Sequence, residues 1–208
     1  MKKVLTFTVA ATVALTLVTG AAAEFDPKRD YMAEMIQAAI EGDIEKGREA
    51  EHLRGLKIAA MGPERIYIPV SFDDLYLLGK IIYAEAGSYW LSDEWKMAVG
   101  EVVLNRVASP EFPDTIEDVI FQPGQYYSRG SSYFARLRPN ERCVKLALRL
   151  LEGERVLNDP SVIFQANFRQ GSGVHTALYD PYLGWTYFCF SSRPGLYETV
   201  EASACSAA

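Results

Sequence analysis

The sequence predicts an α+β fold in which helices come first and a small antiparallel sheet follows. Residues 71–108 place apolar side chains at the three- and four-residue spacing of buried helix faces. Residues 162–168 and 185–190 are instead β-branched or aromatic, with Gly-Ser-Gly and Asp-Pro turns between them. The chain is 49% hydrophobic and 12% aromatic, a composition that favours a packed core over disorder.

The first 23 residues have the features of an export signal. Two lysines precede an apolar stretch from Val4 to Val18, and Ala21-Ala22-Ala23 fits a cleavage site. The apolar stretch is shorter than the roughly 20 residues that span a bilayer. We therefore expect residues 1–23 to be removed, and a secreted protein without a membrane span to begin near Glu24.

Composition excludes two classes of function. The net charge of −6 leaves no basic excess to neutralise phosphates, which argues against a nucleic-acid partner. His52 and His175 have no partner at ligand spacing, and no C-x-x-C pair occurs, so we expect no metal and no cofactor. The three cysteines are Cys143, expected to be a buried apolar residue, and Cys189 and Cys205, whose pairing stays open.

Residues 24–70 predict a helical hairpin followed by a linker. Asp26-Pro27 has the form of a helix start, and Gly42-Asp43 ends one helix and caps the next. The second helix is highly charged, and prolines lie at both ends of residues 61–70. We expect the hairpin to make few contacts with a main domain spanning residues 71–208.

That domain begins with a helix that ends near Glu85. Ser71 is its expected N-cap, and Gly87 is expected to end it in the left-handed conformation. Its buried face consists of Leu75, Leu78 and Ile82. The face reaches Glu85 in the last turn, where desolvation and the helix C-terminus both favour a neutral carboxyl. Such a group suits general acid catalysis, although a place on the solvated helix edge is the alternative.

Further local signals predict the remaining helices. They run from Ser92 to about Ala108, from Asp114 or Thr115 to Ile120, and from Pro139-Asn140 to Gly153.

A polar and aromatic loop over residues 122–134 precedes the strands. It carries Tyr126 and Tyr127, and the strand after it carries Gln165 and Asn167. Aromatic faces beside amides suit carbohydrate, because rings stack on sugars and amides bond their hydroxyl and N-acetyl groups. Core packing is the alternative for each ring taken alone.

An ordered set of motifs points to a family. They are Ile82-Tyr83-Ala84-Glu85-Ala86, residues 98–107 (A-V-G-E-V-V-L-N-R-V), residues 109–113 (S-P-E-F-P) and residues 119–125 (V-I-F-Q-P-G-Q). This set resembles the cell wall hydrolase family of the bacterial spore-cortex-lytic enzymes (SleB-like). The resemblance covers roughly residues 72–190 and departs from the family at Tyr126-Tyr127 and over residues 163–168. It implies a helical, lysozyme-like domain that cleaves peptidoglycan, with Glu85 as its catalytic residue.

A second carboxylate is not evident in the motif block. Asp93 and Glu94 are better explained as first-turn partners of a helix dipole. Glu101 fits a structural partner of Arg106 or a supporting residue near the site. A mechanism with one carboxylate is therefore expected, unlike the usual glycosidase pair.

The sequence thus predicts an exported glycosidase associated with the cell wall and acting on peptidoglycan glycan strands between N-acetylmuramic acid and N-acetylglucosamine. Glu85 is the expected general acid and base, and the resemblance implies lytic transglycosylase chemistry. The residues expected to hold substrate are Asn105, Gln125, Tyr126, Tyr127, Gln165 and Asn167. Three alternatives remain: a simple muramidase hydrolase, a glycan-binding protein without activity, and an adaptor that acts through the hairpin of residues 26–60.

Overall fold

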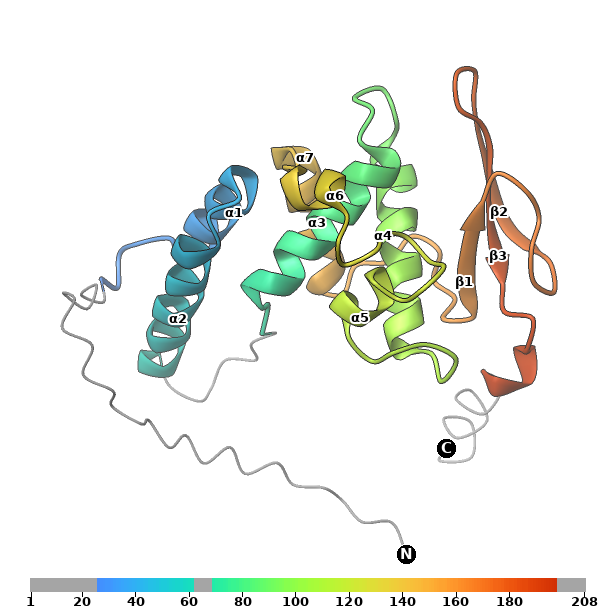
Figure 1. Ribbon diagram of the computed structural model, residues 1–208. Coiled ribbons are helices and arrows are strands. Elements are labelled where there is room, and N and C mark those ends of the chain that lie inside the picture. The colour runs from blue at the N-terminus through green and yellow to red at the C-terminus, as the bar shows by residue number, and fades with distance from the viewer. Residues whose placement is uncertain (1–25, 62–68, 198–208) are drawn as a thin grey trace, which may run out of the picture.

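The computed structural model describes residues 26–61 and 69–197 and confirms the α+β fold (Figure 1). The helices are α1 (Tyr31–Glu41), α2 (Ile44–Ala60), α3 (Phe72–Ala86), α4 (Asp93–Ala108), α5 (Ile116–Ile120), α6 (Ser132–Arg136) and α7 (Glu141–Leu151). The strands are β1 (Val162–Ala166), β2 (Val174–Asp180) and β3 (Gly184–Phe190), followed by a 3₁₀ turn at Pro194–Leu196. The predicted leader, most of the linker and Cys205 lie outside the described residues.

Helix α4 is the centre of the main domain. Its buried residues lie all around the helix, because helices cover one side of it and the sheet covers the other (Figure 1). One apolar cluster joins α3, α5 and α7, and a second lies between α4 and the sheet. Ala86, the last residue of α3, belongs to the second cluster. The end of α3 therefore lies where the helical part of the domain meets the sheet.

Local capping signals in the sequence are largely confirmed. The side chains of Ser71, Ser92 and Asn140 accept hydrogen bonds from backbone N–H groups three residues on, as N-caps do. The first helix differs from the prediction: it begins at Tyr31 and is capped by Asp30. Asp26 lies in the turn before it, where its carboxylate accepts a hydrogen bond from the N–H of Lys28.

The sheet is antiparallel, with the strand order β1-β3-β2. The sequence predicted β1 and β3 but not β2, which pairs with β3 from Val174 to Asp180, with a register shift between Val174 and Thr176. The side chains of Leu178 and Phe188 face the helices and pack on the cluster around α4. The opposite face of the sheet is the outer face. None of the helices described over residues 26–61 and 69–197 is both long and apolar enough to cross a membrane.

Two cysteines are described. Cys143 is buried in α7 within the helical core, which confirms its predicted role as a small apolar residue. Cys189 is buried in β3. The suggested pairing of Cys189 with Cys205 lies outside the described residues.

The expectation that the hairpin makes few contacts is wrong. The ring of Phe72 packs so closely on Gly47 of α2 that a methyl group there would overlap it. The carboxylate of Glu51 accepts a hydrogen bond from the backbone N–H of Phe72 at 2.9 Å, and Arg48 pairs with Asp73 at 2.9 Å. Helix α1 also contributes to the main apolar core, with Met35, Ala38 and Ala39. A domain boundary at residues 70–71 stays a prediction.

Candidate active site

Glu85 lies in the last turn of α3, but the helix ends differently from the prediction. Gly87 is right-handed, with φ −68° and ψ −16°, rather than left-handed. The reason for glycine is space, since a Cβ there would lie 2.2 Å from the carbonyl oxygen of Tyr83. The end of the helix is instead held by Lys96 of α4.

Lys96 is fully buried, and its ammonium caps the C-terminal end of α3. It donates hydrogen bonds to the carbonyl of Ala86 and, at 2.7 Å, to that of Ser88. A cation at this end of a helix also complements the partial negative charge of the last carbonyls. The sequence analysis did not single out Lys96, although a lysine among the apolar residues of a core helix indicates a buried charge with a specific partner.

The carboxyl of Glu85 faces a cavity of about 430 Å³ at the junction of the helices and the sheet. The cavity is lined by Glu85, Arg106, Gly124, Gln125, Tyr126, Phe164, Gln165, Ala166, Phe168 and Gln170. These residues come from α3, α4, the loop after α5, β1 and the segment after β1. Among them Glu85 is the single carboxyl group. The cavity therefore offers one acid surrounded by amide and aromatic groups.

The surroundings of Glu85 weaken it as an acid. Glu85 is exposed by its solvent-accessible area, as the helix-edge alternative expected, yet the protein around its carboxyl partly desolvates it and raises its pKa. A hydrogen bond from the hydroxyl of Tyr127 acts in the opposite direction and lowers that pKa. Desolvation is the larger effect, so Glu85 holds a proton at a higher pH than a fully solvated glutamate does. This is the property that a general acid needs.

Tyr126 and Tyr127 lie beside Glu85, but only Tyr127 bonds to it. The ring of Tyr127 stacks on Phe134 at 4.7 Å, and desolvation together with the nearby Glu85 raises the pKa of Tyr127 to about 12. Its hydroxyl is thus a stable donor. The hydroxyl of Tyr126 is buried without a protein partner, and desolvation raises its pKa as well.

Arg106 is a cavity residue whose role the sequence analysis missed. Its guanidinium donates to the carbonyl of Ile163 at 2.7 Å and to the side-chain oxygen of Gln125 at 3.0 Å. It also lies 5.0 Å from the ring centre of Tyr126. Arg106 therefore fixes the loop wall of the cavity against β1. The sequence had suggested Glu101 as its partner, and that pairing is wrong.

Glu101 has a different task. It is 1% exposed, and its two oxygens accept hydrogen bonds from the backbone N–H groups of Val156, Leu157 and Asn158 at 2.6 to 2.9 Å. The carboxylate therefore holds the turn between α7 and β1. This satisfies its acceptors inside the protein and gives it no place in the cavity lining.

The remaining predicted substrate residues divide into two groups. Gln125 and Gln165 line the cavity, and the side-chain oxygen of Gln165 is buried without a protein partner. Asn105 does not line it: its amide donates to the carbonyls of Asp159 and Val162 at 2.9 and 3.0 Å, which anchors the start of β1. Asn167 is exposed beyond the end of β1 and is also absent from the lining.

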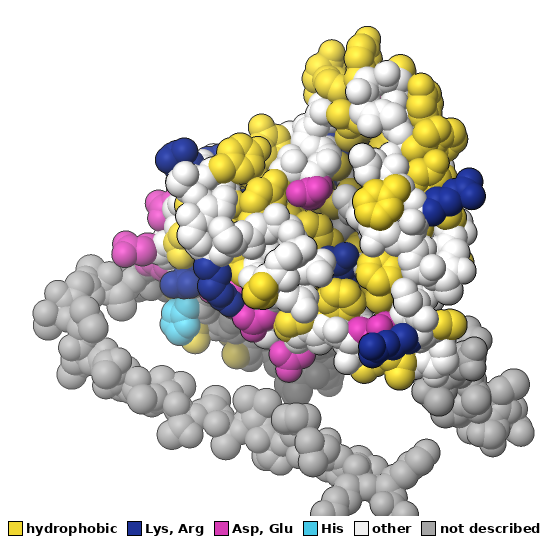
Figure 2. Space-filling model, turned by 45° about the vertical axis from the view of Figure 1, so that its right-hand side comes forward, with side chains coloured by type: hydrophobic (Ala, Val, Ile, Leu, Met, Phe, Trp, Pro, Cys, Tyr) yellow, Lys and Arg dark blue, Asp and Glu magenta, His cyan; other side chains and the backbone are white. Residues whose placement is uncertain are grey.

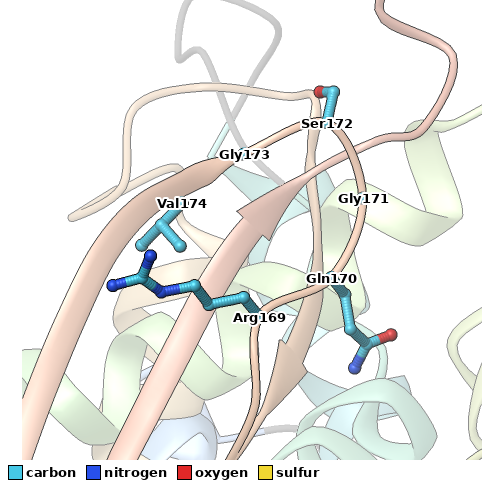
Figure 3. Close-up of a pocket in the computed structure, with 6 residues that line it drawn as sticks. All are labelled: Arg169, Gln170, Gly171, Ser172, Gly173 and Val174. Carbon is cyan, nitrogen blue, oxygen red and sulfur yellow. The ribbon is translucent and has the colours of Figure 1, made fainter.

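A neighbouring cavity lies over the loop that joins β1 to β2. It is lined by Arg169, Gln170, Gly171, Ser172, Gly173 and Val174 (Figure 3). Gln170 lines both cavities, so the two are adjacent. The hydroxyl of Ser172 donates to the carbonyl of Ser191 at 2.7 Å and ties the loop to the segment after β3.

Comparison with known proteins shows similarity to cell wall hydrolases. A family model described as Cell Wall Hydrolase matches residues 92–188, which begin after Glu85. The chain is 36% identical over 86 residues to a spore cortex-lytic enzyme of Bacillus cereus, a match that covers 40% of this chain and 31% of that protein. It is 34% identical over 94 residues to a spore cortex-lytic enzyme of Halalkalibacterium halodurans, covering 44% of this chain and 26% of that protein.

Among solved structures, the catalytic domain of the Bacillus cereus SleB protein is similar to this chain. The identity is 25% and the TM-score is 0.43, with 62% of this chain and 98% of that domain covered. The chain matches about a third or less of the length of the curated relatives. Residues 92–188 thus match the Cell Wall Hydrolase family model, and the chain is similar over this part to spore cortex-lytic enzymes.

Proposed function

We propose that this protein cleaves the glycan strands of peptidoglycan outside the cytoplasm, with Glu85 as general acid and then general base. The observation that carries the proposal is that Glu85 is the single carboxyl lining its cavity and has a raised pKa. The names of the relatives, spore cortex-lytic enzymes, support a cell-wall substrate.

The reaction follows from having one acid. Glu85 donates its proton to the glycosidic oxygen as the bond from that oxygen to the anomeric carbon of muramic acid breaks. The carboxylate then accepts the proton of the C6 hydroxyl of the same sugar while that oxygen bonds to the anomeric carbon. An internal nucleophile needs no second carboxylate to activate water. We therefore propose a lytic transglycosylase that releases 1,6-anhydro-muramic acid ends.

The cavity supplies groups for the sugar. Gln125, Gln165 and Tyr126 line the cavity and offer hydrogen-bond partners. The unpartnered oxygen of Gln165 and hydroxyl of Tyr126 suit N-acetyl and hydroxyl groups, while Tyr127 acts on the sugar only through Glu85. Phe164 and Phe168 offer apolar faces to the sugar rings. A simple hydrolase and a glycan-binding protein without activity are the competing proposals.

Mass spectrometry of products released from purified sacculi in water enriched in heavy oxygen separates these proposals. We expect products that lack one water relative to reducing-end muropeptides and carry no heavy oxygen. Reducing ends that contain heavy oxygen would identify a hydrolase. Binding to sacculi without any released product would identify a non-catalytic protein.

A further inference from the structure

The outer face of the sheet carries an aromatic surface that the cavity around Glu85 does not include. It consists of Tyr179, Trp185 and Tyr187, which we call the aromatic platform. Tyr179 pairs with Trp185 across the β2–β3 ladder, and Tyr187 follows Trp185 on the same face of β3. The ring centres lie 5.1 Å apart between Tyr179 and Trp185 and 6.0 Å apart between Trp185 and Tyr187.

This platform is open to solvent. Tyr179 is 60% exposed and Trp185 is 48% exposed, whereas Leu178 and Phe188 on the other face pack against the helical core. The β2–β3 hairpin projects beyond the helices in Figure 1, and hydrophobic side chains gather over the projecting part of the molecule in Figure 2. Large aromatic rings left exposed together are typical of interaction sites.

The loop between β1 and β2 connects the platform to the cavity of Glu85. Arg169 and Gln170 are neighbours in this loop, and their side chains point to different sides of it (Figure 3). Gln170 lines the Glu85 cavity, while the guanidinium of Arg169 lies 5.7 Å from the ring centre of Tyr187. A long molecule in the cavity can thus continue past this loop onto the platform.

The loop is held tightly in place. Gly171 has φ +60°, and a Cβ at this position would lie 1.8 Å from the carbonyl oxygen of Phe190. Only glycine allows both the conformation and the contact. Arg169 and Gln170 are therefore presented by a fixed turn.

We propose that the aromatic platform with Arg169 is a second binding site for the glycan strand, remote from the bond that is cut. Exposed Tyr and Trp rings stack on the apolar faces of pyranose rings, and Arg169 pairs with carboxylates on the substituents of muramic acid. The proposal rests on the proposed function and names a further part of its substrate site.

The chemistry of the hairpin favours a glycan over a lipid surface. Residues 174–190 contain aromatic and hydroxyl side chains but no lysine or arginine, so Arg169 is the single basic residue of the proposed site. Surfaces that bind anionic membranes combine apolar residues with basic ones. A polymer of repeating sugar rings is also too long for a cavity of about 430 Å³, so part of the strand must lie on the protein surface outside the cavity.

The test compares a polymeric substrate with a short one. Trp185→Ala in the full chain should reduce cleavage of long glycan strands and binding to sacculi about tenfold, the order expected from losing an aromatic contact. Cleavage of a short oligosaccharide that fills only the Glu85 cavity should stay unchanged. Trp185→Phe, which keeps an aromatic ring, should retain most of the wild-type cleavage of long strands and most of the binding to sacculi. Leu56→Ala, at an exposed apolar residue of α2, is the control and should change neither rate.

Four results would overturn the proposal. The first is that Trp185→Ala cleaves long strands as fast as the wild-type protein, and the second is that it loses activity equally on long and short substrates. The third is that Trp185→Phe does not recover the lost activity. The fourth is that the wild-type protein binds phosphatidylglycerol vesicles and Trp185→Ala does not, while both bind sacculi equally. Failure of the proposed function is distinguishable, because the wild-type protein would then cleave neither substrate. The sacculus-binding measurement, made with Glu85→Gln as background, still decides whether the platform binds glycan.

Discussion

The hydroxyl of Tyr127 donates a hydrogen bond to the carboxylate of Glu85. Two effects therefore act on the pKa of Glu85 in opposite directions. Desolvation disfavours the anion and raises the pKa, while the hydrogen bond favours the anion and lowers it. Because the ring of Tyr127 is stacked on Phe134 at 4.7 Å, the donor is held in place. Tyr127 thus adjusts the pH range in which Glu85 can give up a proton.

Tyr127→Phe should move the activity profile to higher pH. The variant keeps the stacked ring but loses the donor, so the pKa of Glu85 rises further above its ordinary value. A general acid works while protonated, and its activity falls as the pH rises through its pKa. The falling limb of kcat/KM against pH should therefore lie at higher pH than in the wild-type protein.

Tyr133→Phe is the matched control for this variant. Tyr133 is exposed, and its ring lies 6.1 Å from the ring of Tyr127. It does not contribute to the shift in the pKa of Glu85. Its pH profile should match that of the wild-type protein. A Tyr127→Phe profile that stays in place or moves to lower pH would contradict the role given to Tyr127.

Glu101→Gln should destabilise the fold without removing the chemistry. The carboxylate accepts three backbone N–H groups, and an amide replaces one acceptor oxygen with a donor. Buried donors left without partners cost about 1–3 kcal/mol of unfolding free energy. Urea unfolding measures this loss, and turnover measured well below the midpoint should stay within a few-fold of wild type.

The control for Glu101→Gln is Glu94→Gln, at an exposed residue in the first turn of α4. It should change the unfolding free energy by less than about 1 kcal/mol. If Glu101→Gln instead kept its stability and lost turnover, Glu101 would be the second acid of a hydrolase.

Local chemistry explains what the sequence could predict. Ser71, Ser92 and Asn140 cap helices through bonds to residues three positions away, so their role is visible in a short window. Glu85 was suggested by an apolar stripe that ends at a carboxyl, and the family resemblance then implied its catalytic role. The raised pKa of that carboxyl agrees with the desolvation that the apolar stripe predicted, while the predicted effect of the helix C-terminus stays a prediction.

Contacts between segments that are distant in the sequence explain the features that the sequence analysis did not predict. Arg106 bonds to Gln125 and Ile163, and Asn105 bonds to Asp159 and Val162, so neither role can be derived from spacing along one helix. Strand β2 mixes His, Thr and Ala and is defined by its pairing with β3. Helix α6 is short and begins within the aromatic loop, where only the cap at Ser131 marks it.

Gly47→Ala should destabilise the protein because the hairpin belongs to the core. An added methyl group would overlap the buried ring of Phe72, and overpacking costs typically about 1–3 kcal/mol. Gly55→Ala on the same helix is the control, since nothing lies within 4 Å of its Cβ position and alanine favours a helix. Thermal or urea unfolding should separate the two. Equal stabilisation by both would restore the expectation of a loosely attached hairpin.

Lys80 should make stability depend on alkaline pH. It is buried against the rings of Tyr76 and Phe134, and desolvation lowers its pKa from 10.5 to about 8. Between about pH 8 and pH 10.5, Lys80 is protonated in the unfolded chain but neutral in the folded protein. The unfolding free energy therefore rises with pH over this range. The unfolding free energy of the wild-type protein minus that of Lys80→Met should increase by up to about 3 kcal/mol from pH 8 to 10.5. A difference that does not change with pH would contradict the shifted pKa.

The most direct test of Glu85 as the catalytic acid is the release of muropeptides from sacculi by Glu85→Gln. The amide cannot donate the proton, so turnover should fall about 100-fold or more, while the unfolding midpoint and sacculus binding stay near those of wild type. Glu94→Gln, which removes a carboxylate outside the cavity, should release products at the wild-type rate. Near-normal release by a folded Glu85→Gln protein would contradict the account.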